Sequence, residues 1–187
     1  MKKICIVVDV PNWAIGHLAN AVATRIGRKY DIDVIAIHPK AIERGEVDIE
    51  SIKRELMRFD IIDFHYWRTG SQLVERIPEL KQKILMVTHQ NDKDLFAADW
   101  SAFHTIVART QYAYNKLKEK YGDKVTMIHI GIDIDQFQYH GKDPSIPVIG
   151  YVGRVVPWKG LKEVARAAYE LGYPLMVMGK MDKPSLS

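Results

Sequence analysis

The sequence predicts an open, doubly wound α/β fold with a parallel sheet, on the evidence of three features. Short apolar runs alternate with helix-length amphipathic stretches along the chain. The runs are apolar on both faces, as parallel strands covered by helices are. The connections between them are short, which favours a repeated strand–helix order over separate groups of strands and helices.

Six apolar runs rich in β-branched residues are expected to form the strands of a first sheet. They are KICIVV, DVIAIH, IIDFHY, KILMVT, FHTIVA and VTMIHI, at 3–8, 33–38, 61–66, 83–88, 103–108 and 125–130. The amphipathic stretches predict helices over 16–28, 48–59 and 110–121. Gly122 follows the last of these and is a typical helix stop.

A polar stretch with two prolines and a glycine, QYHGKDPSIP, interrupts this pattern and is typical of an interdomain linker. A strand VIGYVG, a helix over 158–171 and a strand YPLMVMG follow it. The sequence therefore predicts a Rossmann-like domain over 1–138, a linker over 139–147 and the start of a second domain over 148–187. The alternative is that the last β-α-β unit adds strands to the first sheet.

Composition and charge narrow the class of protein. With 47% hydrophobic and 27% charged residues, the chain is expected to be globular and not disordered. Its formal net charge of +4 suits an anionic ligand, although solubility alone explains such a charge equally well. No run of Lys and Arg and no nucleic-acid motif occurs, so a nucleic-acid partner is not expected. The single cysteine, Cys5, lies in an apolar run and is expected to be a buried thiol.

The N-terminal stretch MKKICIVVDVPNW predicts a cytoplasmic protein. Its apolar run is too short for a signal peptide and lacks a small-residue cleavage site. No window of the sequence approaches the roughly 20 apolar residues of a membrane span. The mildly basic charge would also suit an acceptor at a membrane surface.

The stretch IGYVGRVVPWKG, at 149–160, joins a strand to a helix through a turn. Such a turn is an anion site, because free backbone N–H groups and the helix dipole face the ligand. Gly153 allows a close backbone approach, Arg154 offers a bidentate fork to phosphate oxygens, and Lys159 adds a point charge. The stretch matches neither a P-loop nor a dinucleotide fingerprint.

The run YVGRVVPWKGLKEVARAA resembles the start of the donor-binding domain of GT-B glycosyltransferases, in particular the large retaining family 4. VTMIHIGIDIDQF resembles the family's segment before the domain crossover, with Gly131, Asp133 and Phe137 at the matching places. Ile130 stands there where the family has Asn. HTIVARTQYAYNKLKEKYG resembles the family's preceding strand and helix, with Thr110 where Ser is common.

The resemblance implies a GT-B fold and a truncated glycosyltransferase. It implies transfer of a sugar, with retention, from a nucleotide-diphosphate sugar to a saccharide, a lipid-linked sugar or a small molecule. No cofactor and no obligatory metal is expected. The family's later E-x7-E motif, which holds the donor, has no counterpart in this chain. The chain alone is therefore expected to be inactive.

The resemblance also implies three catalytic residues: His89, Arg154 and Lys159. Arg154 and Lys159, together with Gly153, would grip the donor diphosphate and stabilise the charge on the leaving nucleoside diphosphate. His89 would contact the transferred sugar at the end of its strand. A histidine held by local hydrogen bonds is an equally good interpretation of that position.

Residues of the acceptor site or cleft are expected at the carboxyl ends of the first strands, where open α/β sheets bind their ligands. They are Asn12, Trp13, Gly16, His65, Trp67 and Arg68. Gly16 stands where the family's glycine-rich first loop approaches donor or acceptor. Trp67 would stack on a sugar ring, although such an aromatic more commonly plugs the end of a sheet.

Two other functions remain open. A nucleotide-sugar 2-epimerase shares the GT-B architecture, but the spacing of Arg154 and Lys159 favours the transferase. A non-catalytic fragment or binding module would bind the donor without turning it over. The incomplete second unit is expected to expose Ile149, Val152, Leu175 and Val177 or their neighbours. Docking of this unit on a second copy, giving a homo-oligomer, or poor order of the unit is therefore expected.

Overall fold

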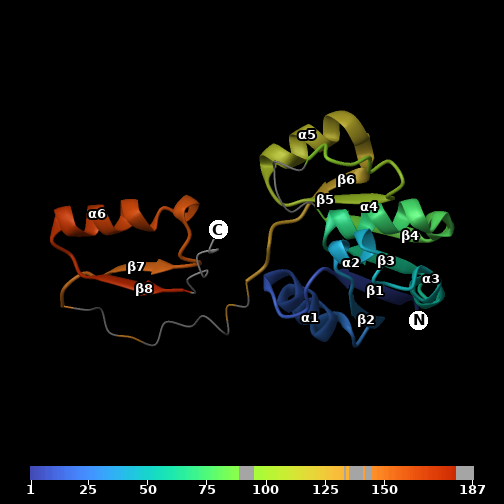
Figure 1. The fold of residues 1–187 in the computed structure, drawn as a ribbon, viewed down its shortest axis with the longest axis horizontal. Helices are drawn as coiled ribbons and strands as arrows, with labels where there is room; N and C mark the ends of the chain where they lie inside the picture. The colour runs from blue at the N-terminus through green and yellow to red at the C-terminus, as the bar shows by residue number, and fades with distance from the viewer. Residues whose placement is uncertain (89–94, 133, 135–140, 142–144, 180–187) are drawn as a thin grey trace. The chain divides into compact units, whose positions relative to one another are not determined.

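Two sheets organise the chain, one in each of the units into which its contacts divide it, Met1–Ile132 and Asp133–Ser187 (Figure 1). The structure is a computed structural model that describes residues 1–88, 95–132, 134, 141 and 145–179. Most of the linker expected over 139–147 lies outside these residues. None of the helices in the described part of the chain is long and apolar enough to cross a membrane.

The first unit is built on a six-stranded parallel sheet, which confirms the predicted open α/β fold. Its strands are β1 (Lys3–Val8), β2 (Asp31–Ala36), β3 (Ile61–Phe64), β4 (Ile84–Thr88), β5 (Thr105–Ala108) and β6 (Val125–Met127). They lie in the order β2-β1-β3-β4-β5-β6. The chain therefore winds from β1 outward to β2 and then in the opposite direction through β3 to β6. Such a reversal places ligand sites at the carboxyl ends of the central strands.

The helices of the first unit cover the two faces of the sheet unequally. They are α1 (Ala14–Ile26), α2 (Pro39–Glu43), α3 (Ile49–Leu56), α4 (Trp67–Arg76) and α5 (Gln111–Tyr121), with the 3-10 helices η1 (Pro78–Gln82) and η3 (Gly122–Lys124). Ala19 of α1 packs with Ile6 and Val8 in a small cluster on one face of the sheet. Helices α2 to α5 contribute to the large cluster on the other face.

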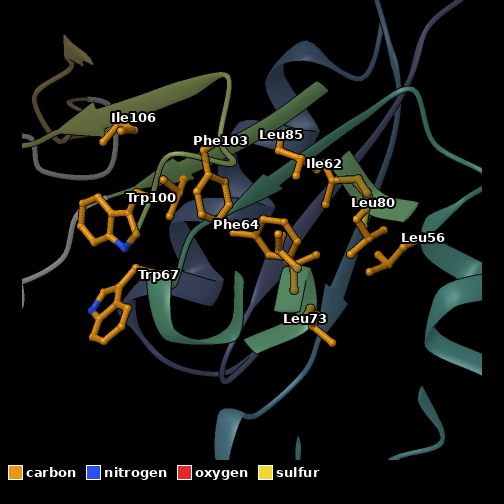
Figure 2. Close-up of a cluster of buried hydrophobic side chains, with 14 of the residues drawn as sticks. Leu56, Ile62, Phe64, Trp67, Leu73, Leu80, Leu85, Trp100, Phe103 and Ile106 are labelled. Carbon is orange, nitrogen blue, oxygen red and sulfur yellow. The ribbon is translucent and has the colours of Figure 1, made fainter. Parts of the chain in front are cut away.

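The large cluster is the core of the first unit, and Figure 2 shows its centre. Phe64 and Phe103 meet edge-on with ring centroids 6.0 Å apart. Trp100 is fully buried, stacks on Tyr121 with centroids 6.5 Å apart, and lies 6.2 Å from the ring of Trp67. Aromatic contacts of this kind add to the free energy gained by burying apolar area.

The strand expected over 61–66 is shorter than predicted, and a helix that the sequence reading missed follows it. β3 ends at Phe64, and α4 begins at Trp67. Trp67, Leu73 and Val74 are buried along one side of α4. Burial of this stripe in the core favours a helix, for which no element was predicted.

The second unit pairs β7 (Ile149–Val152) with β8 (Leu175–Met178) in a parallel sheet of their own, connected by α6 (Leu161–Leu171). The helix predicted over 158–171 begins three residues late, at Leu161. Pro157–Lys159 form a separate 3-10 helix, η5, and Gly160 has a φ of 73°. That left-handed conformation suits glycine and separates η5 from α6.

One face of the second sheet exposes apolar side chains. Val152 is 81% exposed, and Met176 and Met178 are 58% and 60% exposed. Val177 is also exposed, whereas Ile149 and Leu175 are half-buried. The expected exposure is thus confirmed for Val152 and Val177, and at Ile149 and Leu175 it falls on their neighbours Val148 and Met176. Association with a second copy stays a prediction.

Cys5 is fully buried in β1, as predicted. Burial, helped by the charges of Asp33, Glu55 and Asp63, raises the pKa of its thiol from 9.0 to about 12. Because the thiolate is the reactive form, we expect native protein at pH 8 to resist a thiol reagent that labels the unfolded chain rapidly. Equal labelling rates in the native and unfolded states would contradict this burial.

The raised pKa of Cys5 also predicts a dependence of stability on pH. Above about pH 9 the thiol ionises in the unfolded chain but stays protonated in the fold. The unfolded state then binds fewer protons than the native state, so the free energy of unfolding falls as pH rises. The contribution of the thiol is fully present below pH 9 and is lost towards pH 12. Urea titrations of the chain and of Cys5→Ser across this window measure it, and the loss is expected to be smaller in the variant.

Candidate functional site

The backbones at the carboxyl ends of β7 and β8 approach each other closely. The amide of Gly153 donates to the carbonyl of Met178 at 2.9 Å. A Cβ placed on Gly179 would lie 1.7 Å from the carbonyl oxygen of Gly153. No other residue fits at position 179 without a backbone shift. At the carboxyl end of the second sheet, two residues without side chains, Gly153 and Gly179, therefore bring their backbones into contact.

The turn that follows β7 is held by its own hydrogen bonds. The carbonyl of Arg154 accepts from the Tyr151 hydroxyl at 2.9 Å and from the amide of Val156 at 3.1 Å. The amide of Lys159 donates to the carbonyl of Val156 at 3.0 Å. Tyr151 and Val156 are buried, whereas Arg154 and Lys159 are exposed. The two cationic residues thus extend from a fixed backbone.

Helix α6 starts directly after this turn. Gly160 is its N-cap residue and, having no side chain, makes no side-chain capping hydrogen bond. Backbone amides of the first turn and the positive end of the helix dipole attract an anion at such a terminus. Glu163 lies in the same turn, where its negative charge stabilises the dipole. Lys159 belongs to η5 and not to the first turn of α6 as expected, so its charge precedes the helix.

In the first unit, the loop after β1 carries Asn12, Trp13 and Gly16. Asn12 is exposed and Trp13 is 60% exposed, at the N-cap position of α1. Gly16 is buried, and a Cβ on it would lie 2.1 Å from the carbonyl oxygen of Pro11. Close packing of α1 on its own entry loop therefore explains this glycine.

The end of β3 places His65, Trp67 and Arg68 in different surroundings. His65 is 7% exposed, and its Nε2 lies 3.0 Å from Oδ2 of Asp63. Trp67 is buried against Trp100, with the Arg68 guanidinium carbon 5.4 Å from its ring centroid. Stacking of Trp67 on a sugar would require this packing to open. Arg68 itself is exposed.

Two charged residues that were not predicted as site residues are Asp63, whose Oδ2 lies 3.0 Å from His65 Nε2, and Arg109. Asp63 interrupts the otherwise apolar strand IIDF, and that interruption was the available signal. Arg109 follows β5, and burial lowers the pKa of its guanidinium while the charge of Asp63 opposes the shift. His89, the third predicted catalytic residue, lies outside the described residues. Within the described ranges, no group of three His, Cys, Asp or Glu residues is arranged as metal ligands would be.

The predicted residues therefore fall into two local sets. Gly153, Arg154 and Lys159 share the turn between β7 and α6 in the second unit. Asn12, Trp13 and Gly16 belong to the β1–α1 connection of the first unit, and His65, Trp67 and Arg68 to its β3–α4 connection. Both connections of the first unit lie at the carboxyl edge of its sheet, where ligands of open α/β sheets bind.

Comparison of the chain with known proteins shows which fold it shares with a solved structure but does not assign it to a family. No family model matches the chain, and no curated protein matches it. A solved structure of MnaA from S. aureus with UDP matches at a TM-score of 0.59 and 14% sequence identity. The match covers 99% of this chain and 64% of that chain. The two proteins share a Rossmann-like α/β fold of the GT-B-like kind, and this chain spans 64% of the length of its structural neighbour.

Proposed function

We propose that this chain carries the diphosphate-binding turn of a nucleotide-sugar enzyme, and that the enzyme is a retaining glycosyltransferase. The observation that carries the proposal is the turn between β7 and α6, where bare backbone, a helix N-terminus and two exposed cations come together. The resemblance of its sequence to the family 4 donor domain supports the transferase. The UDP in the structural neighbour supports a nucleotide ligand for this fold.

The chemistry follows from charge. Amides in the first turn of α6 donate to oxygens of the diphosphate, and Arg154 grips them through a bidentate fork. Lys159, the last residue of η5 and two residues before α6, adds a second positive charge. When the bond between sugar and phosphate breaks, negative charge grows on the leaving diphosphate, and these groups stabilise it. Protein cations neutralise the leaving group, so we propose no obligatory metal for this step.

A nucleotide-sugar 2-epimerase is the second candidate. It would use the same grip on the diphosphate, and a UDP-bound neighbour favours it at least as much as a transferase. Turnover by the complete enzyme separates the two. An epimerase interconverts two nucleotide sugars without an acceptor, whereas a transferase releases the nucleoside diphosphate. A non-catalytic binding module would do neither.

Calorimetric titration of this chain with UDP and GDP tests the diphosphate site. We expect binding of both, weakened at least about tenfold in Arg154→Ala, because a hydrogen-bonded charge pair contributes about 1.5–3 kcal/mol. Arg166→Ala is the matched control, since Arg166 lies on α6 and pairs with Glu170 at 3.0 Å. Equal weakening in both variants, or no binding by the intact chain, would contradict the proposal.

A further inference from the structure

A buried tyrosine of β7 lies against the turn that carries Arg154. Tyr151 is 9% exposed, and its register partner in β8 is Val177. Its hydroxyl oxygen would lie 3.7 Å from a Cβ placed on Gly153, so the end of the ring is beside the backbone of that residue. The hydroxyl donates to the Arg154 carbonyl at 2.9 Å. The only polar atom of this side chain therefore bonds to the backbone of the residue proposed to grip the diphosphate.

The Arg154 carbonyl accepts from two donors that differ in geometry. The Val156 amide reaches it at 3.1 Å from only two residues along the chain, which closes a γ-turn. So small a ring bends the hydrogen bond away from linearity, and bending weakens it. The Tyr151 hydroxyl comes instead from the strand, and it rotates about its C–O bond to face the acceptor. The hydroxyl is therefore the stronger of the two constraints on this carbonyl.

The backbone of Arg154 is held on both sides of its Cα atom. Before it, the Gly153 amide donates to the Met178 carbonyl at 2.9 Å, which ties the turn to β8. After it, the carbonyl of Arg154 itself is held by Tyr151. Gly153 restricts the backbone little by its own conformation, because it has no Cβ. These two hydrogen bonds therefore set the direction in which the Cα–Cβ bond of Arg154 leaves the turn.

We propose that Tyr151 is a positioning residue of the diphosphate site, and that its hydroxyl fixes the Arg154 backbone so that the guanidinium is presented before the ligand arrives. The identity of the ligand rests on the proposed function. A side chain whose backbone is fixed in advance loses less conformational freedom on binding, and this raises affinity. Because its ring is buried and its hydroxyl bonds to a carbonyl, Tyr151 acts through Arg154 and not by contact with the diphosphate.

The test is an NMR titration of the whole chain with UDP, repeated with Tyr151→Phe, which removes the hydroxyl and keeps the ring. We expect the Kd to rise about 3- to 10-fold, the range expected for one neutral hydrogen bond. Without ligand, hydrogen exchange at the Val156 amide should accelerate, because the turn loses its stronger constraint. Tyr151→4-aminophenylalanine keeps a donor at this place and should restore both values, which a side chain with only a packing role would not require. Tyr169→Phe is the matched control, since Tyr169 is 87% exposed on α6.

A double-mutant cycle separates positioning from general stabilisation of the second unit. In the Arg154→Ala background, Tyr151→Phe should weaken UDP binding by less than about twofold, because no guanidinium remains to be oriented. The same loss in both backgrounds, or an unchanged Kd in Tyr151→Phe alone, would overturn the proposal. Exchange at the Val156 amide keeps the two proposals apart. An unchanged rate in Tyr151→Phe overturns the positioning role even if UDP binds, whereas accelerated exchange without UDP binding by the parent chain contradicts only the diphosphate site.

Discussion

Replacing Gly16 with alanine is expected to destabilise the first unit by about 3 kcal/mol, the upper end for an overpacked core. The new Cβ would lie 2.1 Å from the carbonyl oxygen of Pro11 and 2.6 Å from that of Val10. Both are backbone atoms, so α1 must move away from its entry loop and take Ala19 out of contact with the sheet. In an exposed helix the same substitution would stabilise by about 1 kcal/mol, so the expected sign is reversed.

Urea denaturation followed by circular dichroism measures the effect of Gly16→Ala. Gly131→Ala is the matched control, since nothing lies within 4 Å of a Cβ at that position. The control is expected to stay within about 0.5 kcal/mol of the parent chain. Equal stabilities of the two variants would show that α1 does not pack on its loop as described.

Gly179→Ala is expected to abolish UDP binding while leaving the first unit folded. Its Cβ would meet the carbonyl oxygen of Gly153 at 1.7 Å and the carbonyl carbon at 2.9 Å. The end of β8 must then separate from β7, and the hydrogen bond from the Gly153 amide to Met178 is lost. Because Arg154 extends from this same turn, its guanidinium loses its fixed position.

Two measurements on Gly179→Ala separate the local effect from general unfolding. Hydrogen exchange at the Gly153 amide should accelerate, while exchange in β1 and β3 stays unchanged. Gly150→Ala, in β7, has nothing within 4 Å of the added Cβ and should keep the UDP affinity of the parent chain. Retained UDP binding in Gly179→Ala would show that the ligand site does not depend on the close approach of the Gly153 and Gly179 backbones.

Much of the fold could be predicted from the sequence because it depends on local patterns. Parallel strands buried on both faces leave long apolar runs, and each strand in the described part of the chain overlaps one of the expected runs. Thr110 shows the same for helices, since its hydroxyl accepts from the Ala113 amide at 3.1 Å and begins α5 where the sequence predicted. The ends of helices and strands were less predictable. Burial in the core determines where α4 begins, and the left-handed backbone conformation of Gly160 determines where α6 begins.

The candidate site was predictable only in part. The strand–turn–helix pattern around Arg154 is continuous in the sequence, so its residues could be named in advance. The charge of Asp63 acts on Arg109 only because the sheet order places β3 and β5 on either side of β4, which no local pattern records. Gly179 looked like an ordinary strand end, because its close approach to Gly153 depends on the pairing of β7 with β8.

A 1H–15N correlation spectrum of the chain, titrated with UDP, tests directly whether the diphosphate binds between β7 and α6. We expect the largest shifts on the amides of Gly153 and Arg154 and on those of Gly160 to Glu163, in the turn and the first turn of α6. Arg154→Ala should remove these shifts. Largest shifts in the first unit, or shifts that persist in Arg154→Ala, would contradict a diphosphate site between β7 and α6.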